Sequence, residues 1–109
     1  MSGSLSTLAH HVYFWLKNPE SKADVAELIR GVKTLTSIET IKSSHIATPA
    51  ATEDRNVIDN SYSVSWLAFF DSEGDEQVYQ THPTHLKFIE ACEHLWSKVV
   101  VYDSVQIEE

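Results

Sequence analysis

The stretch Ser61–Asp71, with the sequence SYSVSWLAFFD, decides the fold. Its β-branched and aromatic residues predict a strand, in which successive side chains point to opposite faces. One face is expected to carry Tyr62, Val64, Trp66, Ala68 and Phe70, and the opposite face Leu67 and Phe69. Because both faces carry apolar side chains, this strand must be covered on both sides.

Three further strands and three helical segments are expected around it. The strands are predicted at Leu8–Lys17, Thr40–Thr48 and Lys98–Ile107. The helices are predicted from Ser21 to Leu35, at Asp75–Gln80 and at Pro83–Trp96. Ser21 and Asp24 resemble a capping box at the first helix, and Pro83 suits the first turn of the last one. The order β-α-β-β-α-β predicts an α+β, ferredoxin-like fold, with one four-stranded antiparallel sheet and its helices on one face.

The second face of this sheet has no helix to cover it. On the first strand Tyr13 and Trp15 oppose Val12, Phe14 and Leu16, and on the last strand Val100 and Tyr102 oppose Val99 and Val101. At about 25 cal/mol per Å² of apolar surface, leaving such a face in water would cost many kcal/mol. We therefore expect a second copy to cover it, which gives a homodimer in the form of a dimeric α/β barrel. A pocket is then expected between the sheet and the helices.

The segment Tyr79–His85, with the sequence YQTHPTH, carries the candidate catalytic groups. His85 falls on the apolar stripe of the helix that begins at Pro83, so its ring is expected to point inward. Desolvation and the helix dipole both favour a neutral imidazole, which can act as a general base, and Tyr79 can donate a hydrogen bond to a carbonyl. The competing interpretation is a core histidine bonded to backbone. His82 and His85 have a metal-like spacing, but no compact third ligand accompanies them, so neither a metal nor another cofactor is predicted.

The length and composition of the chain limit the number of domains and the kinds of partner that we expect. A length of 109 residues with 42% hydrophobic content predicts one domain, assigned to residues 8–107 after a disordered tail at residues 1–7. Sixteen acidic against eight basic residues argue against a nucleic-acid partner. The single Cys92 lies on a helical apolar stripe and is interpreted as a core residue.

The apolar run Val12–Leu16 is too short to span a membrane, and Met1–Ser4 lacks the basic start of a secretory signal. We therefore expect a cytoplasmic protein without a membrane partner.

Four sequence features together point to a known family. They are the run HHVYFWLK at residues 10–17, Tyr62 before the third strand, the His82-Pro83-Thr84-His85 element, and VVVYD at residues 99–103. With these, the chain resembles the stress-responsive A/B barrel (Dabb) domain over about His10 to Val105. The resemblance implies a dimeric ferredoxin-like α/β barrel.

The resemblance also implies roles for individual residues. In the plant polyketide-cyclase branch of the family, a tyrosine and the second histidine of the His-Pro-x-His element act on the substrate, and they look like Tyr79 and His85. The histidine on the first strand corresponds to His10. A further pocket histidine of that branch falls on Val64, and the bulky Trp66 two residues later is expected to narrow the pocket. His82 and His45 complete the expected substrate-binding set, with His45 as a substitute for the missing histidine.

Three functions follow as hypotheses. The leading one is a dimeric barrel that binds a small apolar or carbonyl-bearing molecule, with cyclase- or lyase-like acid–base chemistry from His85 and Tyr79. The second is a non-catalytic, stress-associated oligomeric barrel in which the histidines only build a filled core. The third is a cofactor-assisted or haem-handling oxygenase, because other dimeric α/β barrels do such work.

Overall fold

A computed structural model describes residues 7–108 of the chain. The elements follow the order β1 (Leu8–Leu16), α1 (Lys22–Leu35), β2 (Ile41–Ala47), β3 (Val64–Phe70), α2 (Glu73–Thr81), α3 (Pro83–Cys92), the short 3₁₀ helix η2 (Glu93–Leu95) and β4 (Trp96–Val105). Apart from Thr7, the tail expected at residues 1–7 lies outside the described residues. The Thr7 carbonyl accepts a hydrogen bond from the Gln106 amide at 3.2 Å.

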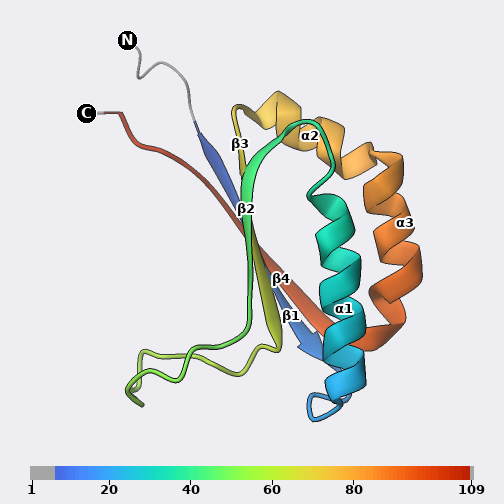
Figure 1. Ribbon diagram of the computed structural model, residues 1–109. Helices are drawn as coiled ribbons and strands as arrows, with labels where there is room; N and C mark the ends of the chain where they lie inside the picture. The colour runs from blue at the N-terminus through green and yellow to red at the C-terminus, as the bar shows by residue number, and fades with distance from the viewer. Residues whose placement is uncertain (1–6, 109) are drawn as a thin grey trace.

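The four strands form one antiparallel sheet in the order β2-β3-β1-β4. All three α-helices lie on one side of this sheet, and the connection between β2 and β3 extends on the other side (Figure 1). This arrangement confirms the α+β, ferredoxin-like prediction. No helix within residues 7–108 has the length and apolar character needed to cross a lipid bilayer.

Local signals begin and end the helices. Ser21 caps α1 by accepting a hydrogen bond from the Asp24 amide at 3.1 Å. His82 ends α2 in an extended conformation, and Pro83 begins α3 at the next residue. The predicted last helix was too long at its C-terminal end, because α3 stops at Cys92 and a single 3₁₀ turn leads into β4. The last strand accordingly begins at Trp96, two residues before its predicted start.

The core lies between the helices and the inner face of the sheet. Its largest fully buried side chains are Trp66, Phe70, Leu28, Leu35, Ile38, Val32 and Val64. The helices α1 and α3 approach closely at Gly31, where an added Cβ would lie 2.5 Å from the Cys92 Sγ atom. This close approach explains a glycine inside a helix, where it otherwise costs about 1 kcal/mol relative to alanine.

No helix of the described residues covers the outer face of the sheet. On β1 the buried residues alternate with half-buried ones, so Tyr13 and Trp15 face outward as expected. Tyr62 was expected on the same face of the sheet as Val64, and this expectation was wrong. It precedes the first residue of β3, so the strand alternation does not apply to it, and its ring packs against that of Tyr13 on the outer face at 5.0 Å.

Candidate functional site

A cavity of about 290 Å³ lies between the inner face of the sheet and the helices α2 and α3. Its wall brings together four of the predicted site residues, His10, Trp66, Tyr79 and His85. Apolar side chains line most of the remainder, and on the edge strand β4 these include Val99 and Val101, which are 37% and 44% exposed. The cavity therefore exists because the helices leave the inner face of β4 partly uncovered.

His85 lies in the first turn of α3, directly after the bend at His82 and Pro83. Its Nδ1 atom lies 3.0 Å from the Gln80 carbonyl oxygen. Because a carbonyl can only accept, Nδ1 carries the proton and Nε2 of the neutral ring keeps a free lone pair. Burial lowers the pKa of His85, the nearby imidazole of His10 lowers it further, and the bond to Gln80 opposes both effects. The side chain is half-buried, so the expected inward ring reaches the cavity wall while part of it stays exposed.

Tyr79 lies near the end of α2 and is only 2% exposed. Its ring centroid is 4.4 Å from that of His85 and 5.4 Å from that of His10. Burial, with smaller contributions from the carboxylates of Glu76 and Asp103, raises the pKa of the Tyr79 hydroxyl well above its usual range. The phenol therefore stays protonated at neutral pH and can donate a hydrogen bond. Within residues 7–108 the structure shows no hydrogen-bond partner for it.

His10 is 3% exposed and is held by a carboxylate that the sequence interpretation missed. The antiparallel register of β1 and β4 places Asp103 opposite His10, and its Oδ1 atom lies 2.6 Å from the His10 Nδ1 atom. Glu76 from α2 approaches the same nitrogen at 4.0 Å. Since a carboxylate accepts, His10 donates this hydrogen bond from its Nδ1 atom.

His10, Glu76 and Asp103 are also the residues in the described part of the chain that could hold a metal ion. Their ligand atoms all lie within 4.8 Å of one another. The imidazole–carboxylate hydrogen bond accounts for the closest pair in this cluster. Two sequence signals bore on this cluster: Glu76 lies three residues before Tyr79, on the same side of α2, and Asp103 ends the VVVYD run at residues 99–103.

Trp66 is fully buried in the cavity wall, and its indole nitrogen has no hydrogen-bond partner among the described residues. Val64 is equally buried but belongs to the core beside the cavity rather than to its lining. The sequence interpretation treated Trp66 only as bulk that narrows the pocket. Its unpaired N–H group also makes it a potential hydrogen-bond donor.

The other two predicted binding residues lie away from the cavity. His82 caps α3, because its Nδ1 atom accepts from the Thr84 amide at 3.1 Å, and its Nε2 atom lies 3.3 Å from the Glu39 Oε1 atom. His45 is exposed on β2, opposite Leu67 on the outer face of the sheet. Neither His82 nor His45 therefore lines the cavity that His85 reaches.

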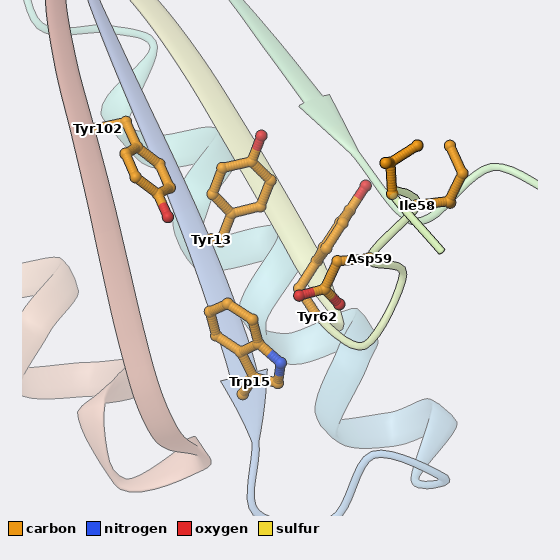
Figure 2. A pocket seen from close by; sticks show the side chains of 7 residues that line it. Tyr13, Trp15, Ile58, Asp59, Tyr62 and Tyr102 are labelled. Carbon is orange, nitrogen blue, oxygen red and sulfur yellow. The ribbon is translucent and has the colours of Figure 1, made fainter. Parts of the chain in front are cut away.

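A second basin, of about 390 Å³, lies on the outer face of the sheet. Figure 2 shows Tyr13, Trp15, Tyr62 and Tyr102 around it, with Ile58 and Asp59 of the β2–β3 connection alongside. This connection is tied to the sheet by Ser61, whose Oγ atom accepts from the Trp15 indole at 3.0 Å and donates to Asp59 at 2.6 Å. An aromatic surface of this kind is typical of a protein–protein contact.

Family comparison agrees with this architecture. The family model described as Stress responsive A/B Barrel Domain (Dabb) matches residues 8–106. The chain belongs to this family. Solved structures with the same fold include a Dabb family protein from Mesorhizobium loti, with 19% identity, a TM-score of 0.77, and coverage of 94% of this chain and 99% of the other.

Two further solved structures extend the comparison of this Dabb chain. A dimeric ferredoxin-like protein of unknown function from Thermobifida fusca has 17% identity and a TM-score of 0.75, with 94% and 93% of the two chains covered. A hydroxynitrile lyase from Passiflora edulis has 22% identity and a TM-score of 0.75, with 94% and 95% covered. At these identities the similarity establishes the fold. A search of curated proteins found no match.

Proposed function

We propose that this Dabb protein binds a small apolar or carbonyl-bearing molecule in the inner cavity, with His85 as the acid–base group and Tyr79 as a hydrogen-bond donor. The observation that carries the proposal is the geometry of His85. Its Nδ1 atom is engaged by the Gln80 carbonyl, and its other nitrogen is left free at the wall of a cavity of about 290 Å³. This volume lies just below the usual range for ligand pockets, about 300–1,000 Å³, and suits a small molecule.

The two groups have complementary chemistry. A neutral imidazole can take a proton from a hydroxyl group or from a carbon next to a carbonyl, and can return it later in the reaction. A protonated phenol can donate to the carbonyl oxygen, where negative charge develops when that proton leaves. This combination suits a cyclase- or lyase-like reaction. The structural neighbour named a hydroxynitrile lyase supports the lyase-like option.

We also propose that two copies pair through the outer face of the sheet. The aromatic side chains there stay partly exposed within the described chain, and Tyr102 is 65% exposed. Burying such a surface is favourable by about 25 cal/mol per Å². The description of the Thermobifida fusca neighbour as dimeric supports this arrangement.

The alternative hypothesis is a non-catalytic oligomeric barrel, and it predicts a different environment for His85. It requires a filled interior in which both nitrogens of His85 are bonded within the protein. The cavity and the free Nε2 atom favour the binding function instead.

The experiment is a binding and turnover screen of small carbonyl compounds and cyanohydrins with His85→Ala and Tyr79→Phe. We expect each variant to weaken binding or turnover by at least tenfold. The matched controls are His94→Ala, a surface histidine 3.9 Å from Glu27, and Tyr62→Phe on the outer face. Sedimentation of every variant separates loss of the site from loss of assembly. Unchanged binding and turnover in both cavity variants would overturn the proposal.

A further inference from the structure

The buried indole of Trp66 is a cavity group whose missing hydrogen-bond partner the fold does not account for. The side chain is 0% exposed, it lies in the cavity wall, and its N–H group has no acceptor among residues 7–108. A buried donor without a partner costs about 1–3 kcal/mol. Most buried polar groups in native proteins are paired, so an exception at a cavity indicates that something outside the chain accepts this hydrogen bond.

A second donor lies beside it. The rings of Trp66 and Tyr79 have centroids 5.6 Å apart, and both rings lie in the cavity wall. The Tyr79 hydroxyl stays protonated because burial raises its pKa. The imidazole of His10 lies 6.2 Å from the Trp66 ring, but its Nδ1 proton is already taken by Asp103. Two adjacent rings of the cavity wall therefore each carry a donor without a partner among residues 7–108.

The charge of the lining narrows the class of ligand further. No lysine or arginine lines the cavity, one glutamate does, and the whole chain carries a formal charge of −8. A carboxylate or phosphate ligand would find no cation to offset its desolvation. A neutral carbonyl oxygen, in contrast, can accept two hydrogen bonds without bringing a charge into the cavity.

We infer that Trp66 is a specificity-determining residue whose indole N–H donates to the carbonyl oxygen of a neutral, mostly apolar ketone or aldehyde bound in the cavity. This inference rests on the proposed function and names its ligand class. Trp66 and Tyr79 then hold the same oxygen from adjacent rings. The apolar part of the molecule lies against Phe14, Phe88 and Val99, and the free nitrogen of His85 faces the bound molecule.

The test uses two probes that differ in one position. Acetophenone carries a carbonyl oxygen where α-methylstyrene carries a methylene group, and the two molecules have nearly the same shape. In ¹⁵N-labelled protein, the indole N–H signal of Trp66 is assigned by its loss in Trp66→Phe. We expect acetophenone to shift this signal downfield, and α-methylstyrene to leave the signal without that shift. Trp15 serves as the internal control, because its indole already donates to Ser61 on the outer face and its signal should not move.

Affinity gives an independent measurement. We expect the preference for acetophenone over α-methylstyrene to fall about 3- to 10-fold in Trp66→Phe, the change expected for one lost hydrogen bond. In the matched variant Trp15→Phe the preference should stay as in the parent protein. If Trp66→Phe does not fold, the Trp66 signal is identified as the indole signal that remains in both Trp15→Phe and Trp96→Phe, the variants of the other two tryptophans. The indole shift in the parent protein then decides the question alone.

The outcomes separate this inference from the function on which it rests. If acetophenone perturbs His85 and Tyr79 but leaves the Trp66 indole signal and the probe preference unchanged, the binding function stands and the role of Trp66 is wrong. A bound water that keeps the indole satisfied would give this same result. If neither probe perturbs any cavity residue at millimolar concentration, both the carbonyl-binding function and this inference are overturned.

Discussion

The rings of Tyr79 and His85 lie 4.4 Å apart, centroid to centroid, at an interplanar angle of 42°. They come from two helices that meet at His82, the residue that ends α2 and precedes α3. The Gln80 carbonyl, one residue after Tyr79, accepts the hydrogen bond from His85. The bend between the helices therefore sets both the spacing of the two groups and the tautomer of the imidazole.

The protonation of His85 should make the free energy of unfolding depend on pH. Its pKa is lowered from 6.5, mainly by burial, so below about pH 6.5 the unfolded chain binds more protons at this residue than the folded chain. The free energy of unfolding should thus fall as the pH drops below 6.5, and this contribution should level off below the lowered pKa. Urea denaturation of the parent and His85→Gln between pH 5 and 8 measures it, and NMR titration of the His85 ring should give a midpoint below 6.5. A midpoint at or above 6.5 would contradict the burial argument.

The close approach of α1 and α3 should make Gly31 intolerant of a side chain. Gly31→Ala should destabilise the fold by about 1–3 kcal/mol through overpacking, although alanine is intrinsically the better helix residue. The new Cβ would lie 2.5 Å from the Cys92 Sγ atom, so adding Cys92→Ala should recover part of the loss. Gly74→Ala is the control, because its nearest contact would be at 3.7 Å and no loss is expected. Chemical denaturation compares the four proteins.

The carboxylate of Asp103 should contribute to stability through the buried imidazole of His10. Asp103→Ala leaves the His10 Nδ1 proton with only the more distant Glu76, and should cost about 1–3 kcal/mol. Asp103→Asn should cost less, since its amide oxygen can still accept. The control is Asp71→Ala, which removes an exposed ion pair with Lys42 at 3.0 Å and should cost about 0–1 kcal/mol. Equal losses of stability in Asp103→Ala and Asp71→Ala would mean that the contact with His10 contributes no more than an exposed ion pair.

A charge on the outer face of the sheet should prevent dimerisation. Tyr102→Glu places a carboxylate among the aromatic side chains that we expect the second copy to cover, where its desolvation would be unfavourable. Sedimentation at micromolar concentration should show a monomer for this variant and a dimer for the parent. Val78→Glu, at a 46% exposed position on α2, is the control and should remain dimeric. A dimeric Tyr102→Glu protein would place the contact elsewhere.

Local patterns were sufficient for much of the fold. The alternation along β1, the cap at Ser21 and the helix start at Pro83 are each written within a few neighbouring residues, and each agrees with the structure. The placement of Tyr62 failed because the alternation rule holds only inside a strand, and the sequence does not mark where β3 begins. The last helix was predicted too long for a similar reason. Trp96 is compatible both with the end of a helix and with the start of a strand, so its residue type does not mark where β4 begins.

The site was harder to predict because its contacts are distant in sequence. Asp103 lies 93 residues after His10, and only the register of β1 against β4 brings them together. The unpaired indole of Trp66 could not be predicted either, because it depends on whether any residue packed around it in the fold supplies a hydrogen-bond acceptor. His45 and Trp66 carry equally suggestive side chains, yet they project from opposite faces of the sheet.

The strand β1 separates two surfaces through its own alternation. His10 points to the cavity, and its immediate neighbour His11 points to the face where a second copy is expected. The partly exposed inner side of β4 leaves the cavity open on the face that the expected second copy does not cover. Any influence of occupancy on subunit affinity must then pass through the sheet itself, in which β1 and β4 both carry residues of each surface.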